Sequence, residues 1–148
     1  MPAFEINVTG LAGLQERLAA AAGRIDVETK AATTAAGAIV ETAIKNQLRT
    51  SSHPKRTPTP SAPGDPPSLV SGNLMRSITV HGPTGGLGTY TSQIGPTAIY
   101  GRIQELGGTT GRGHRTHLPP RPYVDPAWSL AAPEVATTYL TAWSRIFE

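Results

Sequence analysis

The sequence predicts an α+β fold in which a long helix and a C-terminal helix cover an antiparallel sheet built on a β-hairpin. Apolar residues recur at helical spacing through the first third of the chain and again after residue 125. Between them, two short alternating segments flank the glycine-rich sequence GPTGGLG, a pattern typical of a hairpin. With 148 residues and no visible repeat, the chain is expected to form one domain over residues 1–148.

The N-terminal third predicts one strand and two helices. Residues 4–8, FEINV, alternate apolar and polar side chains as a half-buried strand does. A short helix follows, capped by Thr9 and fading at Gly23, with one apolar face formed by Leu11, Leu14 and Leu18. A second and longer helix is expected from Asp26, a plausible N-cap, to about Arg49.

Two segments contain no apolar periodicity. Residues 50–68 are rich in proline, and residues 107–120 are rich in glycine, proline and basic side chains. Both are expected to be extended or mobile loops. Composition alone does not separate a solvated linker from a loop that contacts a partner.

The second half predicts a hairpin between two short helical pieces. Ser71 caps a helical turn that ends at Arg76, and the strands of the hairpin follow, with an inward side formed by Ile78, Val80, Tyr90 and Ile94. Residues 98–106 read as a short helix that Gly107 stops.

The C-terminal helix is expected to start at Asp125 as N-cap, with Pro126 in its first turn, and to end near Phe147. Pro133 should kink or split this helix, because proline removes a backbone hydrogen bond from a helix interior.

The charge distribution favours an anionic partner. Residues 45–121 hold nine Lys or Arg side chains against Asp65 and Glu105. The chain has no cysteine and no apolar run of membrane-spanning length, so we expect a soluble, unexported protein without disulfides or membrane contact.

No residue pattern supports an enzyme, a metal site or a cofactor. His114 and His117 lie three residues apart without a nearby cysteine or acid, so surface imidazoles are favoured over zinc ligands. Ser71 and Ser77 have no base that the sequence can place beside them. The GPTGGLG segment joins two strands and lacks the lysine of a phosphate-binding loop.

Three segments in the second half resemble one family. Residues 71–80 (SGNLMRSITV), 94–108 (IGPTAIYGRIQELGG) and 118–128 (LPPRPYVDPAW) are similar, in order and spacing, to segments of the head–tail joining proteins of long-tailed, siphovirus-type bacteriophages. These are also called tail-completion, neck or minor tail-component proteins. The chain departs from the family in its longer proline-rich link and in Gly101, where alanine is commoner. The matching positions are Gly72, Leu74, Ser77, Ile78, Tyr100, Glu105, Gly107, Arg121, Pro122, Tyr123, Pro126 and Ala127.

The resemblance implies a non-enzymatic virion protein, made in the host bacterial cytoplasm, that forms a homo-oligomeric ring of six copies at the neck. Such a ring is a head–tail connector or tail terminator, and its partners would be other copies of the chain and adjacent head-connector or tail-tube proteins. Passing DNA is a further partner without sequence preference. The candidate interface or DNA-facing residues are Lys55, Arg56, Arg112 and Arg115.

Two alternatives stay open on the sequence. The chain could be a soluble accessory protein that binds nucleic acid non-specifically through its basic middle. Arg121 either pairs with Glu105, tying the loop to the short helix, or lies exposed.

Overall fold

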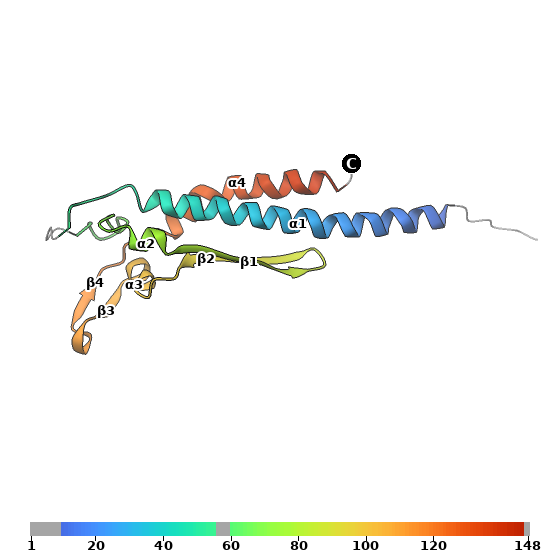
Figure 1. The fold of residues 1–148 in the computed structure, drawn as a ribbon. Coiled ribbons are helices and arrows are strands. Elements are labelled where there is room, and N and C mark those ends of the chain that lie inside the picture. The colour runs from blue at the N-terminus through green and yellow to red at the C-terminus, as the bar shows by residue number, and fades with distance from the viewer. Residues whose placement is uncertain (1–9, 56–59, 147–148) are drawn as a thin grey trace, which may run out of the picture.

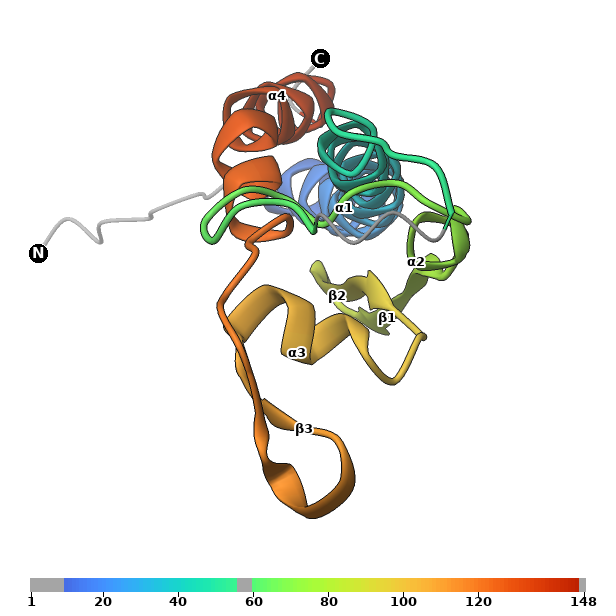
Figure 2. The same ribbon diagram turned by 90° about the vertical axis from the view of Figure 1, so that its left-hand side faces the viewer.

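The computed structural model describes residues 10–55 and 60–146 and confirms the predicted α+β class. Helix α1, Leu11–Gln47, runs along nearly the whole molecule (Figure 1). Helix α4, Asp125–Ser144, lies antiparallel to it on one side, and the hairpin of β1, Ile78–Gly86, and β2, Thr89–Pro96, lies on another (Figures 1 and 2). The strand predicted at residues 4–8 and the cap predicted at Thr9 fall outside the described residues.

Helix α1 corrects the prediction of two separate helices. It continues for 37 residues, about 55 Å at 1.5 Å per residue, without a break at Gly23. A glycine costs a helix only about 1 kcal/mol relative to alanine, and the four alanines directly before Gly23, residues 19–22, favour helix strongly. Asp26 is an interior residue of α1 and caps nothing.

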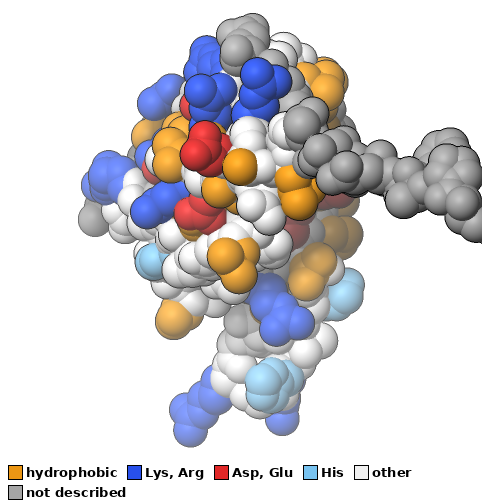
Figure 3. Space-filling view, turned by 90° about the vertical axis from the view of Figure 1, so that its right-hand side faces the viewer, with side chains coloured by type: hydrophobic (Ala, Val, Ile, Leu, Met, Phe, Trp, Pro, Cys, Tyr) orange, Lys and Arg blue, Asp and Glu red, His pale blue; other side chains and the backbone are white. Residues whose placement is uncertain are grey.

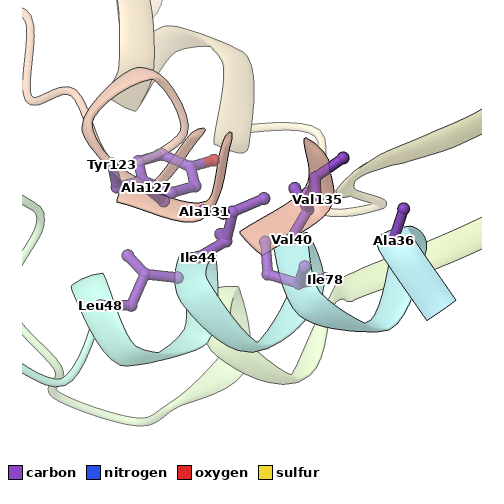
Figure 4. Close-up of a cluster of buried hydrophobic side chains, with 9 residues drawn as sticks. All are labelled: Ala36, Val40, Ile44, Leu48, Ile78, Tyr123, Ala127, Ala131 and Val135. Atoms are coloured by element: carbon purple, nitrogen blue, oxygen red, sulfur yellow. The ribbon is translucent and has the colours of Figure 1, made fainter. Parts of the chain in front are cut away.

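The core lies where α1, α4 and the start of the hairpin meet. Figure 4 shows side chains of α1 and α4 pointing toward one another around Ile78. Much of the facing surface of α4 is alanine, which lets the two helix backbones approach closely. The buried apolar cluster consists of Ala36, Val40, Ile44, Leu48, Ile78, Tyr123, Ala127, Ala131 and Val135.

Polar side chains extend the contact between α1 and α4 beyond this core. The hydroxyl groups of Thr33 and Tyr139 are 2.9 Å apart, within hydrogen-bond distance. The indole N–H of Trp143 donates to Oγ1 of Thr29 at 3.2 Å. Since buried hydroxyl groups are stable only when hydrogen-bonded, these contacts fix how the two helices align.

The hairpin packs on α1 at a glycine. A β-carbon on Gly37, which is buried, would lie 2.9 Å from Cγ1 of Val80, closer than packed atoms approach.

The predicted turn was seven residues long, but the strands continue to Gly86 and Thr89 and leave Leu87 and Gly88 as a two-residue turn. Both turn residues have positive φ, 53° and 76°, as tight hairpin turns of this length require.

The tip of the hairpin is held to α1 by Asp26. The backbone N–H of Gly88 donates to Oδ1 at 3.0 Å, and the hydroxyl of Tyr90 donates to Oδ2 at 2.9 Å. These two donors, Gly88 first, lower the pKa of Asp26 from its ordinary value of 3.8. The same contact raises the pKa of Tyr90.

The shorter elements follow the predicted order. Helix α2, Asn73–Arg76, precedes β1, and helix α3, Gly101–Leu106, follows β2 and ends at Gly107. Residues 107–120 contain an element that the sequence did not predict: β3, Gly108–Thr110, pairs with β4, Thr116–Leu118, around the single turn η1, Arg112–His114.

Helix α4 starts one residue earlier than predicted and is continuous through Pro133. Its N-cap is Val124, one residue before the predicted Asp125, and no side chain of its own caps it. Pro133 does not split the helix, which continues to Ser144 with this proline on its exposed side. Phe147, the predicted end, lies outside the described residues.

Replacing Ile78, which is 2% exposed, with Asp should lower the free energy of unfolding by more than about 3 kcal/mol. The substitution removes a core side chain and leaves an unpaired charge among apolar neighbours. Leu140→Asp is the control, because Leu140 is 68% exposed and its replacement should change stability by only about 0.5 kcal/mol. Equal midpoints of chemical denaturation for the two variants would contradict the described packing.

The contact between Asp26 and the hairpin tip should depend on pH. Because the pKa of Asp26 is lowered on folding, its stabilising effect is present above the unfolded value of 3.8 and is lost as the pH falls through the folded value. In NMR spectra, the Gly88 amide should therefore titrate with a midpoint below 3.8. In Asp26→Asn that titration should vanish, and the pKa of Tyr90 should fall toward 10.0. An unchanged Tyr90 titration in this variant would show that the contact does not form.

Candidate functional site

The most conspicuous surface feature is the hairpin formed by β3, η1 and β4, here called the basic arm (residues 108–118). It extends away from the rest of the chain, as Figure 2 shows. Its strands pair in register, with Gly108 opposite Leu118 and Thr110 opposite Thr116. Residues 111–117 are all exposed, so the arm presents its tip to solvent or to a partner.

The tip of the arm is cationic. It carries Arg112, His114, Arg115 and His117, and the sequence has no acidic residue between Glu105 and Asp125. Figure 3 shows blue and pale blue side chains gathered at the lower end of the molecule, where the arm lies. Neither ion pair found among the described residues involves the arm. Its charge is therefore available to an anionic or hydrogen-bond-accepting partner.

The other two basic candidates are not part of the arm. Lys55 is exposed and lies in the proline-rich segment, and Arg56 falls outside the described residues. The structure thus places Arg112 and Arg115 on one element and does not add Lys55 to it.

Arg121 fixes the base of the arm, in a way that neither sequence alternative anticipated. Its side chain is 7% exposed, and its Nε–H donates to the carbonyl oxygen of Ser61 at 3.0 Å. Its backbone N–H donates to the carbonyl of Gln104 in α3 at 2.8 Å. Arg121 is therefore neither exposed nor paired with Glu105, and it ties the arm to the proline-rich segment and to α3.

Glu105, which lies in α3, caps the N-terminus of α4. Its Oε2 accepts the backbone N–H groups of Tyr123, at 2.7 Å, and Val124, at 3.0 Å. Its Oε1 accepts the N–H of Asp125 at 3.1 Å. The first N–H groups of a helix have no partners within the helix, and a carboxylate is also favoured there by the helix dipole. One side chain of α3 thus fixes the start of α4.

Tyr123 completes this junction from within the core. Its side chain is fully buried, and its hydroxyl donates to the carbonyl of Gly101 at 3.1 Å. Burial, and then the nearby charge of Glu105, raise the pKa of Tyr123. Gly101 is required here, because a β-carbon would lie 2.5 Å from Cγ of Pro96. This contact explains why the chain carries glycine where the family it resembles more often has alanine.

The remaining motif positions lie at three places in the fold: at α2, at the start of α3 and at the start of α4. Gly72 is the N-cap of α2 with φ 72°, Leu74 packs against the core, and the Ser77 hydroxyl donates to the Leu74 carbonyl at 2.7 Å. Tyr100, the N-cap of α3, is partly exposed. Pro122 precedes the capped junction, and Pro126 and Ala127 lie in the first turn of α4. These positions lie in or beside α2, α3 and the start of α4.

An apolar hollow of about 670 Å³ opens beside this joint. It lies between the end of β2, α3 and the first turns of α4, and its rim includes Ile99, Leu106 and Trp128. These three side chains are largely exposed, at 98%, 64% and 49%. Exposed apolar patches of this kind are typical of surfaces that bind other proteins.

Within residues 10–55 and 60–146, no group of three or more potential metal-ligating side chains occurs. The two arm histidines therefore have no third ligand in this part of the chain. No described helix is long and apolar enough to cross a membrane.

One family model matches the chain. It is described as "Bacteriophage HK97-gp10, putative tail-component", and it matches residues 12–107. This range covers α1 from its second residue, the β1–β2 hairpin and α3. It includes the motif segment 71–80 and all but the last residue of segment 94–108, whereas residues 118–128 follow it. No curated protein and no solved structure gives a significant match.

Replacing Glu105 with Ala should destabilise the chain by about 1–3 kcal/mol, because three backbone N–H groups lose their acceptor. Glu105→Gln keeps one carbonyl oxygen and should lose less. Hydrogen exchange of residues 123–125 should rise most in Glu105→Ala, and thermal unfolding should rank the three proteins. If Glu105→Ala is as stable as the parent, the carboxylate does not hold α4.

Proposed function

The chain belongs to the HK97-gp10-like family of phage tail components, as its motifs predict, and we propose that it forms a ring at the head–tail joint. In this proposal it is a structural virion protein without enzymatic activity, and the ring holds six copies. The ring completes the tail and connects it to the DNA-filled head, with a head-connector or tail-tube protein as its neighbour.

The observation that carries this proposal is the amount of apolar surface that a single copy leaves uncovered. Ile99, Leu106 and Trp128 rim one hollow, and three leucines near the start of α1 are more than half exposed. A soluble monomer rarely exposes several such surfaces. Burial against identical copies and against neighbouring virion proteins would remove them from water.

The basic arm suits a contact between components of such a joint. Its base is fixed by Arg121 to two other segments, while its tip extends beyond the body (Figure 2). An arm of this form can reach an adjacent subunit or an adjacent ring. It could instead line the channel through which DNA passes, where Arg112 and Arg115 would meet phosphates. We favour the contact between proteins, because the arm is long for lining a channel.

A second function rests on the same cationic tip. A soluble accessory protein could bind nucleic acid without sequence preference through a projecting, acid-free arm. It would then bind duplex DNA as a monomer or dimer, with an affinity that falls steeply as salt rises. Electron microscopy of the purified chain distinguishes the two functions, because rings, and labelled copies at the neck of the virion, are expected only from the first.

Replacing both Arg112 and Arg115 with Ser should leave the fold intact, since both are exposed and each change should cost about 0.5 kcal/mol or less. Particle assembly should fail instead. The test is to complement a phage that lacks this gene and to count joined, DNA-filled particles. Loss of joining indicates a protein contact, whereas joined particles with altered DNA retention indicate a channel lining. Normal yield together with normal infectivity would contradict both roles of the arm.

A further inference from the structure

The first turns of α1 project beyond every element that packs on the rest of this helix. The Arg145–Glu28 ion pair, 3.8 Å, marks where the end of α4 lies against α1. The hairpin tip reaches Asp26 and Ile25 and no further toward the N-terminus. Residues 11–24 are therefore exposed, apart from half-buried Ala21, and Figure 1 shows this part of α1 standing alone. An isolated helix of this length is only marginally stable in water.

This projecting segment has a continuous apolar stripe. Leu11, Leu14, Leu18, Ala21 and Ile25 follow one another at spacings of three and four residues, the repeat by which helices pack together. The three leucines are 58%, 54% and 61% exposed. Figure 3, which looks onto the end of the molecule from which α1 projects, shows apolar side chains there among charged ones.

A long groove of matching type lies elsewhere on the same chain, between α1 and α4. Two hollows of about 490 and 370 Å³ adjoin one another there and share Glu134. From Glu28 to Gln47 the groove follows α1 for about 29 Å, whereas the stripe from Leu11 to Ile25 needs only about 21 Å. Its α1 side is lined largely by small side chains, including Ala31, Ala35 and Ala38, which let another helix approach closely.

The groove cannot take up the stripe of its own chain. Helix α1 is continuous from Leu11 to Gln47, so its first turns cannot bend back onto its own second half. A second copy of the chain has no such restriction.

Charge also matches between the two surfaces. Arg17 flanks the stripe near its middle, and Arg24 lies two turns further on the same flank. Glu134 lies where the two hollows meet, near the middle of the groove. Neither of the two ion pairs among the described residues involves Arg17 or Glu134. Glu16 lies on the opposite side of α1 from the stripe.

We propose that the projecting segment of α1, residues 11–25, binds in the α1–α4 groove of a second copy, with Arg17 facing Glu134. The contact joins two different surfaces, so each copy still offers a free segment and a free groove. Repetition of such a head-to-tail contact gives a closed ring when its rotation closes. The inference rests on the proposed ring and names the surfaces that hold neighbouring copies together.

A charge exchange tests this contact on the full chain. In sedimentation velocity and native mass spectrometry, Arg17→Glu and Glu134→Arg should each weaken self-association by at least about tenfold, because like charges then meet. The double variant, Arg17→Glu with Glu134→Arg, should restore most of the association. Glu16→Arg is the control: it reverses a charge in the same helix turn, away from the stripe, and should associate like the parent. Circular dichroism should be unchanged in all four, since these side chains are exposed.

The outcomes separate this inference from the proposed function. If both single variants self-associate as strongly as the parent chain, the proposed contact is wrong. Rings seen by electron microscopy would still support the proposed function in that case. An effect of Arg17→Glu without an effect of Glu134→Arg overturns the groove as the binding surface and indicates that two stripes pair with each other. If the parent chain stays monomeric at every concentration, the proposed contact is wrong. Electron microscopy of virions with labelled copies of the chain then tests separately whether the protein lies at the neck.

Discussion

The position of α4, and with it most of the core, depends on one carboxylate. Glu105, in α3, accepts hydrogen bonds from three successive backbone N–H groups, those of residues 123–125. It therefore sets where α4 starts and how α4 is oriented relative to α3. Two buried alanines of α4, Ala127 and Ala131, lie within its first two turns. Tyr123, buried beside this carboxylate, closes the same junction through Gly101. The basic arm lies between α3 and α4 in the chain, so the contacts that hold these two helices together also hold the base of the arm.

A second constraint is the shortage of large apolar side chains at the contact of α1 with α4. Alanine permits close packing but removes little apolar surface from water, so each turn of this contact stabilises the chain only modestly. Larger apolar side chains are present, yet several of them, including Leu14, Leu18, Ile99 and Trp128, lie outside the core. The folded chain therefore leaves much of its large apolar side-chain surface exposed to water.

Local patterns predicted the elements whose structure is set locally. The β1–β2 hairpin, α3 and its end at Gly107 follow from alternation and from turn and cap residues that are neighbours in sequence. The errors arise where the partner is remote. Asp26 resembles a helix cap, but it accepts hydrogen bonds from residues 62 and 64 positions away, and Gly23 breaks nothing in a helix rich in alanine. The cap by Glu105 and the Arg121 contact with Ser61 have no signal in periodicity, because both join separate elements. The strands of the arm have three residues each, GTT and THL, and with Leu118 as their one large apolar side chain they are too short to show alternation.

The two surfaces proposed to bind partners differ in how the chain holds them. The arm is placed by polar contacts at its base, which fix its direction while its tip makes no ion pair with the rest of the described chain. The projecting part of α1 is placed by helix continuity, and the hairpin tip reaches only its last residue, Ile25. Helix α1 carries both its projecting stripe and one wall of the groove, so the angle between these two surfaces is set by a single helix. In a ring built from this contact, that one helix would determine how many copies close it.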